Sequence, residues 1–130
     1  MNGAAPEHSV PARLLVVDDD PAIREVCVDL LSGEGYEVTS VSNGREAVDQ
    51  LAAEPSDLVL MDLMMPELDG VTACKLIKAN ARTKNIPVII MSAGDNLRAR
   101  TRELQGIAAA IVSKPFDFDD LLLTVQQLIP

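Results

Sequence analysis

Leu14-Leu15-Val16-Val17-Asp18-Asp19-Asp20 places three carboxylates directly after a short run of apolar residues. A second apolar run, Leu58-Val59-Leu60-Met61, is followed by Asp62. Short, continuous apolar runs of this kind are typical of parallel strands that are buried on both faces. Because ligands of open α/β sheets bind at the carboxyl ends of the strands, we expect the four acids to converge at one sheet edge. Like charges packed closely are costly unless a cation neutralises them, so the pattern predicts a divalent metal site.

The rest of the chain alternates between strand-like and helix-like patterns, which predicts an α/β fold of the (βα)5 type. Strands are predicted over residues 13–17, 37–41, 58–61, 88–91 and 108–112. Helices are predicted over 21–33, from 44, over 70–80, over 95–105, and from Asp119 or Asp120. Right-handed crossovers between parallel strands then place helices on both faces of a doubly wound sheet. We expect residues 1–12 to form a flexible N-terminal tail and residues 13–130 to form one domain.

Composition narrows the class of protein. The 130 residues are 48% hydrophobic, which suits one packed core, and the net charge of −9 argues against nucleic-acid binding. No apolar run approaches the roughly 20 residues that span a bilayer, and no signal-peptide pattern is present, so we expect a cytoplasmic protein without a membrane partner. Cys27 and Cys74 are too far apart for a C-x-x-C pair and are expected to be reduced core residues.

Two further polar residues follow predicted strands. Ser92 follows the fourth strand, and Lys114 follows the fifth strand, just before Pro115. A single polar residue after a strand carries little information, whereas several of complementary chemistry form a specific set. The strand ends together supply Asp18, Asp19, Asp62, Ser92 and Lys114.

At these positions the sequence resembles the receiver domain of bacterial two-component response regulators. The matching stretches are LLVVDDDPAIRE (14–25), LVLMDLMMPELDG (58–70), PVIIMSAGD (87–95) and VSKPF (112–116). The resemblance extends over about residues 13–129, and both the order and the spacing of the stretches agree. It implies a receiver domain over residues 13–130 and the flavodoxin-like strand order 2-1-3-4-5.

The resemblance also assigns roles to the acids. It implies that Asp62 is the phosphoacceptor, a carboxylate nucleophile that forms an aspartyl phosphate. It implies a magnesium site made by Asp18, Asp19, Asp62 and the backbone carbonyl of Met64. Water and phosphate oxygens would complete the octahedral shell that Mg²⁺ requires.

The remaining strand-end residues receive roles by the same resemblance. Lys114 would pair with Asp62 and later with a phosphoryl oxygen, and Pro115 would be a cis-proline that aims Lys114 into the site. Ser92 would donate its hydroxyl to the phosphoryl group. The conformational switch would involve Ser92 and Ile111. Since the family often carries Tyr or Phe at the position of Ile111, we expect the hydroxyl and the fourth helix to carry the switch here.

The implied partners are a donor and an output. A sensor histidine kinase or a phosphotransfer protein would donate the phosphoryl group. The output protein or domain would bind at the face formed by the fourth helix, fifth strand and fifth helix. Arg98 and Arg102 share one side of that fourth helix, where acids such as Asp119 of a second copy could pair with them in a homodimer. We expect a signalling domain that assists only its own phosphorylation and dephosphorylation.

Three other classes of protein were weighed. A receiver-like interaction module that works without phosphorylation stays open, because Ile111 departs from the usual switch. A magnesium-dependent phosphatase with an aspartyl nucleophile usually carries a second Asp two residues later, where this chain has Met64. A flavodoxin-like nucleotide-binding protein is disfavoured because no glycine-rich phosphate loop follows the first strand.

Overall fold

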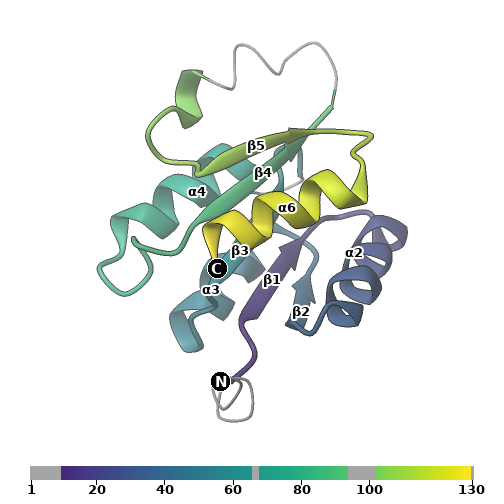
Figure 1. Cartoon of the computed structure of the whole chain (residues 1–130). Coiled ribbons are helices and arrows are strands. Elements are labelled where there is room, and N and C mark those ends of the chain that lie inside the picture. Colours follow the sequence, from purple (N-terminus) through teal and green to yellow (C-terminus); the bar gives the residue numbers. More distant parts are fainter. Residues whose placement is uncertain (1–9, 66–67, 94–101, 130) are drawn as a thin grey trace.

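A computed structural model describes residues 10–65, 68–93 and 102–129 of the chain. Five parallel strands form one sheet in the order β2-β1-β3-β4-β5, so the predicted doubly wound α/β sheet and its strand order are confirmed (Figure 1). The strands are β1 (Arg13–Val17), β2 (Glu37–Val41), β3 (Leu58–Asp62), β4 (Val88–Ser92) and β5 (Ala110–Ser113). The helices are α2 (Pro21–Gly33), α3 (Gly44–Ala53), α4 (Gly70–Ala79) and α6 (Phe118–Leu128).

The helices cover the sheet from both sides (Figure 1). Leu14 and Val16 of β1 pack with residues of α2 and α6, whereas the alternate residues Leu15 and Val17 pack with residues of α3 and α4. This alternation explains why the apolar run is continuous, since both faces of β1 must be apolar. Strands β3 and β4 are buried along their whole length in the same way.

Helices α2, α3 and α4 each begin at a capping residue close behind a strand. Asp20 caps α2 by accepting a hydrogen bond from the N–H of Ala22, and Pro21 occupies the first turn. Asn43 and Asp69 cap α3 and α4 in the same manner. The helix starts are therefore fixed close to the carboxyl edge of the sheet, where the predicted site residues lie.

The starts of two elements differ from the prediction. The fifth strand was predicted from Ala108, but the N–H of Ala108 bonds to the carbonyl of Leu104, so the strand begins at Ala110. The last helix was predicted from Asp119 or Asp120, but Asp117 is the cap, because its Oδ1 accepts from the N–H groups of both later acids.

Some predictions lie partly outside the described residues. The fourth helix was predicted over 95–105, and within the described part residues 102–104 form a helical turn. Arg98 lies outside the described residues, as do residues 1–9 of the tail that was predicted over residues 1–12. The carbonyl of Ala12 already bonds to the N–H of Glu37, so the chain joins the sheet before β1 begins.

The two cysteines lie in the core, and the helices are short. Cys27 and Cys74 are buried and carry free thiols, as predicted. Burial, together with the nearby Asp18 charge, raises the pKa of the Cys27 thiol to about 11, against a smaller opposing effect of Lys114. Within the described ranges, each helix is too short or too polar to cross a membrane.

Two glycines lie tightly against the loop that follows β3. The N–H of Gly70 donates to the carbonyl of Leu63 at 2.8 Å. A Cβ at Gly70 would lie 2.6 Å from the carbonyl oxygen of Asp62 and 2.8 Å from the Leu63 Cα. A Cβ at Gly44 would lie 2.5 Å from the carbonyl oxygen of Leu68. Since each of these contacts is with backbone, the starts of α3 and α4 hold the loop closely.

We expect Gly70→Ala to lower the free energy of unfolding by about 1–3 kcal/mol, because the added methyl group must displace the backbone of Asp62 and Leu63. Gly33→Ala is the matched control, because a Cβ there meets nothing within 4 Å and should leave stability unchanged or slightly raised. Urea denaturation measures both. Equal stability of the two variants would contradict the close contact.

Candidate functional site

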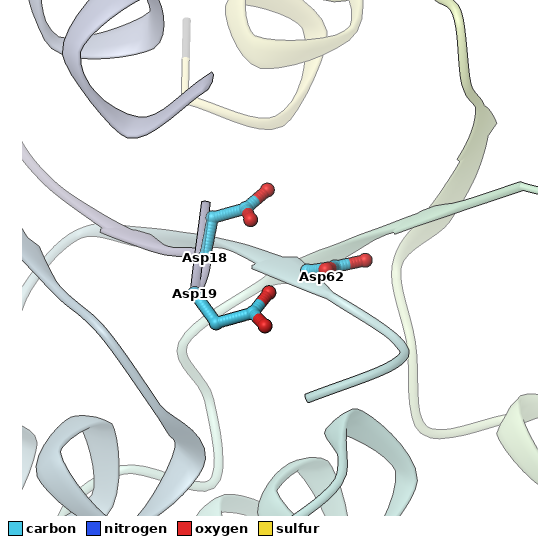
Figure 2. Close-up of side chains that lie close together, drawn as sticks. All are labelled: Asp18, Asp19 and Asp62. Carbon is cyan, nitrogen blue, oxygen red and sulfur yellow. The ribbon is translucent and has the colours of Figure 1, made fainter. Parts of the chain in front are cut away.

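Three carboxylates meet at the carboxyl edge of the sheet. Asp18 and Asp19 follow β1, and Asp62 ends β3, which is the neighbouring strand with Val17 opposite Met61. The three acids each offer an oxygen within 4.8 Å of those of the others, and Figure 2 shows the carboxylates gathered beside the strand ends. Asp18 and Asp62 are buried, whereas Asp19 is exposed. The predicted convergence is thus confirmed for these three acids, whereas Asp20, the fourth acid of the pattern, caps α2.

Asp18 is held through its backbone and its side chain alike. Its Oδ1 accepts from the N–H of Asp20 at 2.9 Å, and its Oδ2 accepts from Nζ of Lys114 at 3.0 Å. Its N–H donates to the carbonyl of Val41, and its own carbonyl accepts from Nη1 of Arg24 at 2.7 Å. These bonds compensate the desolvation of a fully buried carboxylate.

Lys114 bridges two of the acids. Its Nζ lies 3.0 Å from Asp18 Oδ2 and 3.4 Å from Asp62 Oδ1, and its backbone N–H donates to the carbonyl of Ser92. The sequence predicted the pairing with Asp62 but not the shorter contact with Asp18. The Lys114–Pro115 peptide bond is cis. Burial by itself would lower the pKa of Lys114, but the hydrogen bond to Asp18 and the charges of both acids outweigh it and raise that pKa.

The carboxyl group of Asp62 is a weaker acid in the folded chain than in water. Burial raises the pKa of Asp62, and the neighbouring charge of Asp18 raises it further. The Lys114 ammonium and a hydrogen bond from the backbone N–H of Met64 act in the opposite direction, but they do not cancel the effect. The ionised form of Asp62 is therefore less favourable in the folded chain than in water.

The other predicted residues surround this centre. Ser92 ends β4 and is buried, and its Oγ has no hydrogen-bond partner among the described residues. Ile111 lies opposite Ile90 on the edge strand β5 and packs, half-buried, against the core under α3 and α4. The side chain of Met64 is exposed. A buried hydroxyl without a hydrogen-bond partner, such as that of Ser92, is a candidate group for binding a ligand.

An apolar cavity of about 580 Å³ opens beside Lys114. Its wall on the α2 side includes Ile23, Val26 and Cys27, and its other wall includes Pro115 and Phe116. Val26, in the α2 wall, is 53% exposed. Val26 and the cavity therefore form one apolar surface next to the charged site.

Comparison with known proteins agrees with this geometry. The family described as "Response regulator receiver domain" matches residues 14–126. The chain belongs to that family.

Individual relatives extend the comparison of this receiver domain. Response regulator MprA of Mycolicibacterium vanbaalenii is 37% identical over 120 residues, which are 92% of this chain and 51% of that protein. The receiver domain thus spans about half the length of the curated relatives it matches.

Solved structures are similar over nearly the whole receiver domain. The signal receiver domain of a signal transduction histidine kinase from Syntrophus aciditrophicus has a TM-score of 0.84 and 33% identity, covering 91% of this chain and 89% of that one. The receiver domain of the sensor histidine kinase PA1611 from Pseudomonas aeruginosa has a TM-score of 0.84 and 30% identity, covering 92% and 98%. That structure holds a magnesium ion coordinated in its active site cleft.

Sequence reasoning missed one residue that contacts the receiver site. Arg24 was part of a matching stretch but received no role, and the structure places its guanidinium on the Asp18 carbonyl. The available signal was its position in the first turn of the predicted helix, four residues after the capping Asp20, where a long side chain can reach back to the preceding loop.

We expect Asp62→Asn to raise the free energy of unfolding of the metal-free receiver at pH 7. A carboxyl group with a raised folded-state pKa binds its proton more tightly in the folded chain, so stability falls as pH rises from the unfolded pKa through the folded one. The amide avoids this loss, and Lys114 keeps Asp18 as a partner. Thermal melts from pH 3 to pH 8 should show an advantage that disappears below about pH 4.

Asp49→Asn on the exposed side of α3 is the control and should change stability little at any pH. If Asp62→Asn is less stable than wild type at pH 7, the ionised carboxylate is favoured by the fold and our electrostatic account is wrong.

Proposed function

We propose that this receiver domain accepts a phosphoryl group on Asp62 and changes its partner binding in response. The observation that carries the proposal is the grouping of one buried carboxylate pair, a bridging ammonium and an unpartnered hydroxyl at the same sheet edge. Phosphoryl transfer needs alignment and charge neutralisation more than covalent machinery. The set supplies a nucleophile together with groups that pair with phosphoryl oxygens.

The acids also fit a magnesium ion. Asp18, Asp19 and Asp62 offer hard oxygen ligands within 4.8 Å of one another, two of them buried, which is the donor set that Mg²⁺ prefers. The backbone carbonyl of Met64 is our fourth proposed protein ligand. When bound, Mg²⁺ would neutralise the carboxylates and the oxygens of the incoming group. A receiver similar to this one over 92% of the chain holds magnesium in its cleft, which supports the assignment.

In the proposed reaction, an oxygen of Asp62 attacks the phosphorus of a phosphohistidine. A new O–P bond forms, the P–N bond breaks, and the imidazole leaves with the bonding electron pair. Lys114 lies between the two buried acids, so its ammonium can turn from them to an oxygen of the bound phosphoryl group. Ser92 Oγ can donate to another of these oxygens. Hydrolysis of the O–P bond by water later restores the carboxylate.

The donor is proposed to be a histidine kinase or a phosphotransfer protein. A protein donor must bring its histidine to Asp62, so it has to cover the surface around the mouth of the site. The apolar cavity between α2 and residues 114–116 opens there, and Val26 exposes 53% of its surface at the rim. A continuous apolar patch beside a reactive group is typical of a docking surface.

The output partner is proposed to bind at the face formed by residues 102–104, β5 and α6. Arg102 and the first turn of α6, which carries Asp119 and Asp120, are exposed and could bind an output domain or a second copy. Ser92 and Ile111 would connect this face to the phosphoryl group. We infer that Ile111, already packed against the core, leaves the hydroxyl of Ser92 as the principal moving part of the switch.

Labelling with a radioactive small phosphodonor, acetyl phosphate, tests the function. We expect wild type to take up label only with Mg²⁺ present, Asp62→Asn to take up none, and Lys114→Gln to be slowed by on the order of 10²–10³-fold. Asp57→Asn, at the opposite sheet edge, is the control and should label normally. Label on Asp62→Asn, or uptake unaffected by a chelator, would refute the proposal.

We expect Val26→Asp to slow phosphotransfer from a protein donor by about tenfold or more, because it places a charge in the apolar docking surface. The donor is a histidine kinase that phosphorylates the wild-type chain. Labelling by acetyl phosphate should be unchanged, since that donor needs no docking surface. Leu123→Asp on α6 is a matched control, because Leu123 is also 53% exposed but lies away from the cavity. Equal slowing by both substitutions would contradict the assignment of the surface.

A further inference from the structure

Two of the three acids of the site lie on a short segment between β1 and α2. Asp19, which is exposed, depends for its position on the backbone of Asp18 before it and Asp20 after it. Whatever fixes those two peptide groups therefore fixes the carboxylate of Asp19. The paired residues of β1 end at Val17, and the Asp18 N–H makes one further bond, to the Val41 carbonyl of β2, so the sheet does not by itself hold the backbone after Asp18.

Arg24 holds the segment at both ends. Its backbone N–H donates to the carbonyl of Asp20 at 3.0 Å, as the first turn of α2. Its guanidinium reaches back and donates to the carbonyl of Asp18 at 2.7 Å. The carbonyls of the residue before Asp19 and of the residue after it are thus both bonded to Arg24. A charged donor at this distance makes a stronger hydrogen bond than a neutral one.

Arg24 also acts at longer range on Glu46, in the first turn of α3. Glu46 accepts hydrogen bonds from both the N–H and the hydroxyl of Ser42, and these bonds lower its pKa. The charge of Arg24 lowers that pKa further, as the smallest of the contributions. The bond that holds the guanidinium is therefore the one to the Asp18 carbonyl.

We propose that Arg24 is the positioning residue of the metal site: its guanidinium fixes the Asp18 carbonyl and so aims Asp18 and Asp19 at the cation. This inference rests on the proposed function, because it names the residue that organises the proposed magnesium ligands. Arg24 does not itself touch the cation in this account. Residues that orient metal ligands are typically worth 10–100-fold in metal affinity.

The sign of the effect separates positioning from simple electrostatics. A positive charge close to a cation site repels the cation, so removing that charge alone should tighten Mg²⁺ binding. Loss of positioning should weaken it instead. Arg24→Met keeps most of the apolar stem and removes both the charge and the donors, so the two explanations predict opposite changes in the Mg²⁺ dissociation constant.

We expect Arg24→Met to raise the Mg²⁺ dissociation constant by on the order of tenfold, measured by calorimetric titration with MgCl₂. Arg24→Lys, which keeps a charged donor, should recover part of the loss. Arg82→Met is the matched control, because Arg82 also donates to a backbone carbonyl, that of Ala52 at the far end of α3, and should leave the constant unchanged. An unchanged or lower constant for Arg24→Met overturns the inference.

A metal-free measurement tests the same claim independently. The N–H of Asp20 donates to Asp18 Oδ1, so displacement of the segment should move the Asp20 amide proton upfield and speed its exchange with solvent. We expect both changes in Arg24→Met and neither in Arg82→Met. If Arg24→Met fails to fold, Arg24→Gln takes its place, because it loses the charge and most of the reach. An Asp20 amide that is unchanged in these variants overturns the positioning role.

The outcomes also separate the inference from the function on which it rests. Wild-type protein that binds no Mg²⁺ overturns the proposed magnesium site itself. Wild-type protein that binds Mg²⁺, together with Arg24 variants that bind it equally well, overturns only the positioning role.

Discussion

Repulsion among three carboxylates at one sheet edge is the constraint on which the rest of this structure depends. The order of the strands brings β1 and β3 side by side, so Asp18 and Asp62 must share a buried space. The Lys114 ammonium relieves this repulsion by contacting both acids at 3.0 and 3.4 Å. That single cation does not balance three carboxylates, and the pKa of Asp62 stays raised, first by its burial and then by the charge of Asp18. The site is therefore poised to attract further positive charge.

Much of the fold could be predicted from the sequence, because its strongest signals are local. The three central strands are short and apolar on both faces, and such runs leave few alternative assignments. The cap Asp20 followed by Pro21 marks the start of the first helix in the sequence. The errors fall where the local signal is ambiguous. Residues 108–110 are three alanines, which fix no register, and residues 117–120 offer three aspartates as possible caps for α6.

Most residues of the site could be predicted from the sequence, but the contacts between their side chains could be predicted less well. Asp18, Asp62 and Lys114 were predicted to lie close together because each follows or ends a strand, and parallel strands end at one edge of the sheet. The preference of Lys114 for Asp18 depends on side-chain paths that no spacing rule describes. The contact of Arg24 could not be predicted for a different reason. Its guanidinium donates to a backbone carbonyl, and every residue carries a carbonyl, so the sequence carries no residue-specific signal for this contact. The exposure of Val26 could not be predicted from the sequence either, because helical periodicity does not define the width of the buried face of a helix.

Gly44 sets how closely the backbone of Leu68 can lie against the start of α3. The place of a Cβ at Gly44 is 2.5 Å from the carbonyl oxygen of Leu68, closer than a real Cβ could lie. Any larger residue at position 44 would therefore have to push the Leu68 backbone away from the helix. The spacing between α3 and Leu68 thus depends on one absent side chain.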